Sequence, residues 1–126
     1  MKRYVVILIS LSFGLILGGV GGYKVSHMIL SGQSLGYVNY GMEYLNGKDY
    51  IRAMAYFNKA TALDPESFLA HLTLADIYHS MNSYDLALEE YDTSLRLAKY
   101  DREKKLIKEK MDVAKQKQEN EQPEQR

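Results

Sequence analysis

The feature that most constrains the fold of this chain is an internal repeat with an offset of 34 residues. The segment from Tyr40, YGMEYLNGKDYIRAMAYFNKATALDP, aligns without a gap with the segment from Leu74, LADIYHSMNSYDLALEEYDTSLRLAK. Large side chains recur at matching places, so that Phe57 in the first segment corresponds to Tyr91 in the second. A period of this length indicates an array of stacked units that bury their apolar faces against each other.

Each unit contains two segments with apolar residues at helical spacing, separated by a short break. The first break is Asn-Gly-Lys-Asp at 46–49, where Asn-Gly indicates a turn and Asp49 is suited to cap the next helix. In the second unit Ser83 is the expected cap. Between the units, Asp64 is the expected cap of a third helix and Pro65 its first residue. We therefore expect helices at about 35–46, 49–63, 65–81 and 84–98.

Residues 34–101 resemble two tetratricopeptide repeats (TPRs), in which small side chains let two antiparallel helices approach closely and larger ones fill the remaining space. In the first unit, 34–67, the family's positions hold Tyr37, Tyr40, Gly41, Tyr44, Ala53, Phe57, Ala60 and Pro65. The second unit, 68–101, departs from the family pattern at its first position and lacks the closing proline. Its positions hold His71, Leu74, Ala75, Tyr78, Ala87, Tyr91, Ser94 and Lys99. The resemblance implies an all-α fold, a two-repeat TPR α-solenoid.

Residues 101–118 are expected to form a further helix that caps the array, because the ends of a solenoid need a polar outer face. One side of this helix is apolar, with Leu106, Ile107, Met111, Val113 and Ala114. It does not read as a third repeat, because charged residues stand at the positions that the repeat would fill, namely Lys105, Lys108, Glu109 and Asp112. The polar stretch at 119–126 is expected to be a disordered tail.

A membrane anchor is expected before the repeats. Tyr4–Gly22 contains no charged residue and would extend roughly 28 Å as a helix, about the thickness of a hydrocarbon core. Lys2 and Arg3 precede it, and Tyr23 and Lys24 follow, which is typical of anchoring at two interfaces. The positive-inside rule then places the amino terminus in the cytoplasm and the repeats outside it, as in a bacterial inner-membrane protein with a periplasmic domain.

The competing interpretation of this amino-terminal segment is a cleaved signal peptide, which also has a basic start and an apolar run. The run is longer than the usual apolar region of about 7–15 residues, and no A-x-A-like site follows it. These two observations favour an uncleaved anchor. Cleavage would instead make the chain a secreted, soluble TPR protein.

The anchor carries a row of small residues spaced four apart. They are Ser10, Gly14, Gly18 and Gly22. Small residues at this spacing let two helices pack closely in lipid, so we expect the row to contact a helix of another membrane protein. The alternative is that glycine is simply more frequent in transmembrane helices than in soluble ones.

The TPR resemblance also implies a binding groove, because in this family the first helix of each repeat lines a surface that takes a peptide or a helix. The first repeat contributes Leu35, Val38, Asn39, Met42, Leu45 and Asn46. The second contributes Leu69, Leu72, Thr73, Asp76, His79 and Ser80. The Lys and Asn clamp of chaperone-binding members is absent, so the expected ligand is an apolar or amphipathic segment. The alternative is that the connection 25–35 or the cap helix covers part of this groove.

Charge is unevenly distributed, although the net charge of the chain is zero and gives no electrostatic argument for nucleic-acid binding. Residues 36–95 carry three basic and nine acidic side chains, whereas residues 99–117 carry eight basic and four acidic ones. The basic excess at the cap is either an ordinary solvated helix face or a contact with anionic lipid or an acidic partner.

The sequence shows no catalytic pattern. There is no cysteine, no P-loop and no G-x-S-x-G motif. His71 and His79 lie two turns apart near Asp76, but packing and groove lining explain them better than a metal does. We therefore expect no enzyme activity, cofactor or metal.

The expected organisation has five parts: an anchor at 1–24, a connector at 25–33, two repeats over 34–100, a cap at 101–118 and the tail. The leading hypothesis is a non-catalytic scaffold, accessory subunit or assembly factor of a membrane complex. A membrane-tethered peptide or preprotein receptor, which uses the groove alone, is the alternative. The expected partners are membrane proteins, a peptide or helix in the groove, and the lipid bilayer.

Overall fold

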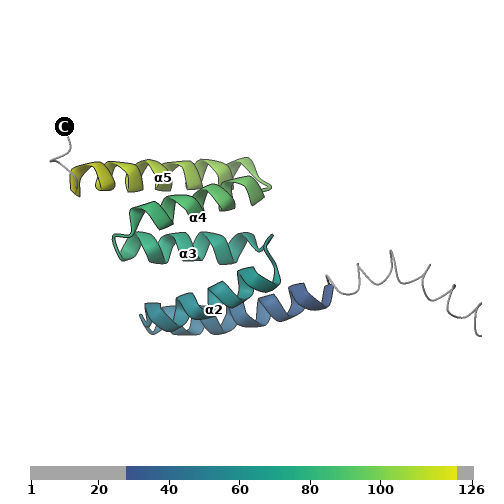
Figure 1. The fold of residues 1–126 in the computed structure, drawn as a ribbon. Helices are drawn as coiled ribbons and strands as arrows, with labels where there is room; N and C mark the ends of the chain where they lie inside the picture. Colours follow the sequence, from purple (N-terminus) through teal and green to yellow (C-terminus); the bar gives the residue numbers. More distant parts are fainter. Residues whose placement is uncertain (1–27, 122–126) are drawn as a thin grey trace, which may run out of the picture.

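The computed structural model describes residues 28–121, which fold as an array of helices and short turns (Figure 1). The helices cover 28–46, α2 (Tyr50–Leu63), α3 (Phe68–Ser80), α4 (Tyr84–Leu97) and α5 (Asp101–Glu121). Consecutive helices alternate in direction, so helix 28–46, α3 and α5 all run the same way (Figure 1). Each predicted repeat is thus one pair of antiparallel helices, and α5 follows as the cap.

The predicted membrane anchor, with Ser10, Gly14, Gly18 and Gly22, lies outside the described residues. Within residues 28–121, no helix has both the length and the apolar character needed to cross a bilayer. The first described helix includes residues 28–33, which the sequence pattern assigned to a connector. The helix thus begins before the repeat does, and Ser34, the first residue of the repeat, is buried with its hydroxyl donating to the Ala60 carbonyl at 2.9 Å.

The turn after helix 28–46 has the hydrogen bonds of a Schellman motif. The N–H of Lys48 donates to the carbonyl of Leu45 at 2.9 Å, and that of Asp49 donates to the carbonyl of Tyr44 at 3.0 Å. Lys48 has a left-handed backbone with φ 60°. The side chain of Asp49 then accepts from the N–H of Arg52 at 3.1 Å, which confirms Asp49 as the cap of α2.

The same turn recurs 34 residues later, between α3 and α4. The N–H of Asn82 donates to the carbonyl of His79 at 3.1 Å, and that of Ser83 donates to the carbonyl of Tyr78 at 2.9 Å. Asn82 has φ 59°. Ser83 stands at the predicted cap position, but its side chain makes no capping hydrogen bond. The repeat in sequence is therefore also a repeat in backbone geometry.

The connection between the two repeats corrects one prediction. Asp64 and Pro65 do not start a helix. The carboxylate of Asp64 accepts from the N–H of Glu66 at 3.2 Å, and its carbonyl accepts from the N–H of Ser67 at 3.0 Å. These two bonds close a turn, so α3 begins only at Phe68.

Two clusters of buried side chains hold the array together. The first consists of Val38, Ala53, Phe57, Ala60, Ala70, Leu74 and Ile77. The second consists of Ala75, Tyr84, Ala87, Tyr91, Ala98, Ile107 and Ala114. Both clusters combine residues of successive units, so each repeat buries its apolar face with the help of the next element.

The two helices of the first repeat approach each other closely at Gly41. A Cβ at this position would lie 3.0 Å from two ring atoms of Phe57, which is itself fully buried. In the second repeat, Ala75 and Tyr91 stand at these two positions and are equally buried. Tyr40 is the repeat-defining residue that differs most in burial, since it is exposed while its counterpart Leu74 is buried in the first cluster. Leu74 has a preceding unit to pack on, and among the described residues Tyr40 has none.

Helix α5 takes the place of a third repeat's first helix, although its sequence does not follow the repeat. Ile107 and Ala114 are buried in the second cluster, and Lys110 binds Asp76, the residue 34 positions earlier, at 2.7 Å. The face that would meet a further helix is exposed. It carries Lys105, Lys108, Glu109 and Asp112. The carboxyl-terminal end of α5 also contacts α4, because the Tyr84 hydroxyl donates to Glu121 at 3.2 Å and Gln118 donates to Asp85.

Candidate partner-binding surface

The predicted groove residues of the first repeat lie on helix 28–46. Most of them are accessible: Leu35, Asn39, Met42 and Asn46 are exposed, and Leu45 is half-buried. Val38 is an exception. It is only 3% exposed and belongs to the first cluster together with Ala70 and Leu74 of α3. The prediction that Val38 faces a partner is therefore wrong, because the next repeat covers it.

The predicted residues of the second repeat lie on α3, and α5 covers part of them. Leu69 and Ser80 are exposed, whereas Leu72 is half-buried against the second cluster. Thr73 is buried, and its hydroxyl donates to the Leu69 carbonyl at 2.8 Å, so this residue does not face a partner either. Position within the repeat therefore does not reveal which of these residues packing buries.

Asp76 holds the cap helix in place. Its Oδ1 accepts from the Tyr91 hydroxyl at 2.6 Å and from the Lys110 ammonium at 2.7 Å. Burial, followed by this hydrogen bond to Asp76, strongly raises the pKa of Tyr91. The carboxylate of Asp76 is therefore engaged within the fold.

His79 lies beside this network, and its ring packs against neighbouring side chains instead of facing the groove. Its ring meets those of Tyr84 and Tyr91 edge-on, at centroid distances of 5.6 and 6.5 Å. Burial, followed by the positive charge of Lys117, lowers the pKa of His79 below its ordinary value. Its Nε2 is buried and has no hydrogen-bond partner among the described residues.

An open pocket of about 590 Å³ lies between the beginnings of α3 and α5. Its walls are apolar and come from Phe68, Leu72, Leu106 and Ile107. Tyr100 and Arg102 stand at its mouth. Leu72, a predicted groove residue, thus contributes to a cavity that no pattern in the sequence revealed.

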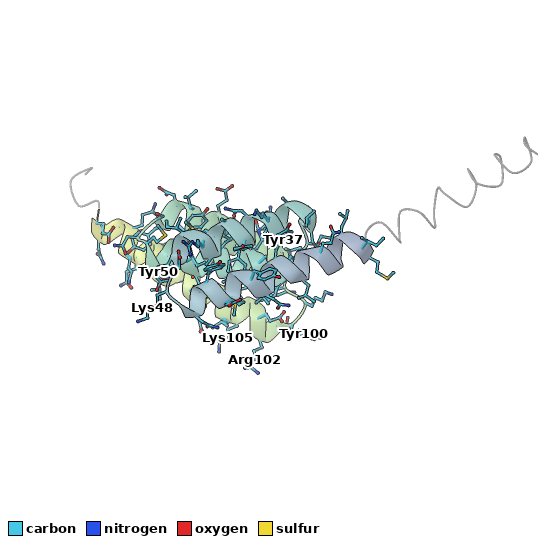
Figure 2. The ribbon with its side chains drawn as sticks, turned by 90° about the horizontal axis from the view of Figure 1, so that it is seen from below. Tyr37, Lys48, Tyr50, Tyr100, Arg102 and Lys105 are labelled. Carbon is cyan, nitrogen blue, oxygen red and sulfur yellow. The ribbon has the colours of Figure 1, made fainter. Side chains whose placement is uncertain are left out.

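The acidic side chain at this pocket is already engaged. The carboxylate of Glu103 accepts from the backbone N–H groups of Lys99 and Tyr100, each at 3.1 Å, and so fixes the start of α5. Arg102 and Lys105 are exposed and form no ion pair within residues 28–121. Figure 2 shows Tyr100, Arg102 and Lys105 close together along the lower edge of the molecule.

Comparison with known protein families agrees with this arrangement of helices. Residues 45–103 match a family model described as Tetratricopeptide repeat. Residues 45–103 are a tetratricopeptide repeat region. None of the curated proteins compared with the chain matches it. TPR regions are typically non-catalytic and bind other proteins, so the family supports protein–protein interaction without indicating a partner.

The first of the two predicted repeats contains a tyrosine cluster that the sequence pattern did not predict. Tyr56 of α2 packs against three tyrosines of helix 28–46, at centroid distances of 6.2 Å to Tyr37, 5.6 Å to Tyr40 and 5.3 Å to Tyr44. The charge of Tyr44, followed by burial, raises the pKa of Tyr56. The ammonium of Lys59 lies 5.2 Å from the Tyr56 centroid. The spacing of three tyrosines by three and four residues on one helix, which places them on the same face, could have predicted this cluster.

In the second repeat of the TPR region, a polar pair occupies the matching place. His71 corresponds to Tyr37 and Glu90 to Tyr56, and the His71 Nδ1 lies 2.7 Å from a carboxylate oxygen of Glu90. The other ring nitrogen lies 3.2 Å from the Pro65 carbonyl. Among residues 28–121, no group of three or more His, Asp or Glu side chains is arranged to hold a metal ion.

Proposed function

We propose that the chain is a scaffold, accessory subunit or assembly factor of a membrane protein complex, in which the TPR region binds a soluble segment of a partner. The observation that carries this proposal is the set of exposed apolar side chains on first helices that run the same way. Leu35, Leu69 and Leu106 are all exposed. Exposed apolar side chains on these helices suit an apolar or amphipathic segment of a partner.

The membrane part of the proposal rests on the amino-terminal sequence. The uncharged run at 4–22 is long enough to span a bilayer as a helix, and the row from Ser10 to Gly22 suits lateral packing against another helix. We propose a single-pass arrangement with the TPR region outside the cytoplasm. Two weak contacts in one chain, one in lipid and one in solution, raise the effective concentration of each partner for the other.

Substitution on the TPR surface tests the soluble contact. Leu69→Asp in the full-length chain, purified from native membranes in mild detergent, should lose at least about tenfold of a reproducibly co-purified partner. Leu86→Asp is the matched control, because Leu69 and Leu86 are both 46% exposed and Leu86 lies outside the predicted groove. A photo-crosslinking residue at position 69, but not at 86, should capture the same partner. Equal retention by both variants would reject this surface.

The lateral contact needs a separate test. Replacing Gly14, Gly18 and Gly22 together by Leu should weaken retention of the membrane partner while leaving capture at position 69 intact. A full-length chain whose anchor is exchanged for an unrelated one distinguishes a scaffold from a tethered receptor. If function survives the exchange, the anchor is a passive tether and the receptor hypothesis is correct.

A further inference from the structure

The place between first helices of successive repeats is closed in one case and open in the other. Between helix 28–46 and α3 it is filled, since Ser34 is 1% and Val38 3% exposed. The residues 34 positions later, Phe68 and Leu72, are half-buried and line the pocket beside α5. The array thus presents an apolar cavity at its carboxyl-terminal end and not at the corresponding earlier place.

The pocket is open to the outside, and no helix follows α5 within the described residues. Leu106 corresponds to Leu72 and Val38, and it is 48% exposed. The volume of about 590 Å³ lies within the range of about 300–1,000 Å³ that ligand pockets have. Such a space accommodates one or two large apolar side chains of a partner.

The free charge around the pocket is positive. Residues 99–110 contain six basic and three acidic side chains. Glu103 accepts from the backbone N–H groups just before α5. Arg102 lines the pocket, and Lys105, one turn further along α5, is exposed. Complementary charge favours a partner with carboxylates next to its apolar anchor.

We propose that this pocket binds an acidic segment of a partner protein, which inserts a large apolar side chain between Leu72 and Leu106 and places its carboxylates beside Arg102 and Lys105. This inference rests on the proposed function and specifies the chemistry of the bound segment. Arg102 provides two-point hydrogen bonding to a carboxylate, and Lys105 adds a second positive charge.

Peptide binding to the full-length chain in non-ionic detergent tests the proposal. The probe is a fluorescein-labelled peptide with a Phe-Leu pair flanked on both sides by Asp and Glu, measured by fluorescence anisotropy. Two further peptides replace the acids by their amides, or the Phe-Leu pair by Ala-Ala. The acidic Phe-Leu peptide should bind at least about fivefold more tightly than either.

Variants of the protein locate the binding site. Arg102→Glu should weaken binding of the acidic peptide by at least about fivefold and Leu106→Asp by about tenfold or more. The matched controls are Arg96→Glu, an exposed arginine of α4, and Val113→Asp, an equally exposed apolar residue of α5. Both controls should bind as the wild type does. Because all four side chains are exposed, the variants should fold, which circular dichroism checks.

Several results would overturn the proposal. These are no binding of the acidic peptide, equal binding of the amide peptide, or insensitivity to Arg102→Glu and Leu106→Asp. Binding of phosphatidylglycerol vesicles through Arg102, without binding of the peptide, would assign the site to lipid instead. If Leu69→Asp loses the native partner while the peptides do not bind, the proposed function stands and this inference fails. If the peptide binds and Leu69→Asp keeps every partner, the pocket stands and the proposed contact at Leu69 fails instead.

Discussion

Tyr37 and Tyr56 of the first repeat correspond to His71 and Glu90 of the second, and each pair lies between the two helices of its own unit. The first pair is aromatic, and Lys59 lies close to both of its rings. The second is a hydrogen-bonded polar pair. The two units nevertheless share the same turn hydrogen bonds and the same left-handed residue at matching places. The backbone repeat is therefore compatible with different side-chain chemistry, provided that the small and large core positions are kept.

The largest expected effect concerns the large side chain at the centre of each unit. Phe57→Ala should lower the free energy of unfolding by about 3–5 kcal/mol, because the ring is fully buried and a cavity would remain. Tyr91→Phe keeps the ring and loses only the hydroxyl bond to Asp76, so it should cost about 1–2 kcal/mol. Thermal and denaturant unfolding of the full-length chain in mild detergent measures both. Equal losses would mean that the second core depends on polar contacts as much as the first depends on packing.

The next largest effect concerns Gly41, the small residue that packs against the Phe57 ring, where the second unit has Ala75. Gly41→Ala should destabilise the chain by about 1 kcal/mol net, because the new methyl group would crowd the Phe57 ring by more than the gain in helix propensity offsets. Gly36→Ala is the control, since nothing lies within 4 Å of a Cβ there, and it should stabilise the same helix by up to about 1 kcal/mol. A stabilising Gly41→Ala would show that Phe57 can move and that the two repeats are equally spaced.

A comparable change, of opposite sign, is expected at the turns. Lys48→Gly should stabilise the chain by about 1 kcal/mol, because a left-handed backbone is unfavourable for a residue with a Cβ. Asn82→Gly should stabilise it less, since asparagine tolerates this conformation. Denaturant midpoints of the two variants, compared with wild type, measure the difference. A larger gain at Asn82 would contradict this reasoning.

The smallest effect is a pH dependence specific to the second repeat. The pKa of His79 is lowered by burial and Lys117, with Lys110 adding to the effect and Asp76 opposing it. The unfolded chain therefore binds the proton more readily than the folded chain does. The resulting stabilisation is complete above the unfolded pKa of about 6.5 and is lost as the pH falls towards the folded pKa.

His79→Leu tests this dependence, because Leu45 stands at the corresponding place in the first repeat. The difference in melting temperature between wild type and variant should grow between about pH 7.5 and about pH 5, with the wild type losing more. Tyr84 and Tyr91, which also face the ring, should not titrate in this range. A difference that stays constant with pH would show that His79 does not contribute.

Local signals made most of the fold predictable. The Asn-Gly break and the cap at Asp49 act within a few residues, and the 34-residue spacing carried them into the second unit. The binding surface was less predictable, because it depends on how one repeat packs on the next. Val38 and Thr73 have groove positions in the repeat and are nevertheless covered. The pocket beside Leu106 likewise results from where α5 ends the packing, which no short segment encodes.

The exposed charges on α5 also bear on how this chain behaves at high concentration. The exposed face of α5 carries charged residues at the positions where the first helices of the two repeats pack against neighbouring helices. These residues are Lys105, Lys108, Glu109 and Asp112. An apolar stripe at these four positions would offer a second molecule the place of a missing helix. Contacts of that head-to-tail kind do not close on themselves and generate open filaments. We therefore expect these charges to disfavour fibre formation at high protein concentration.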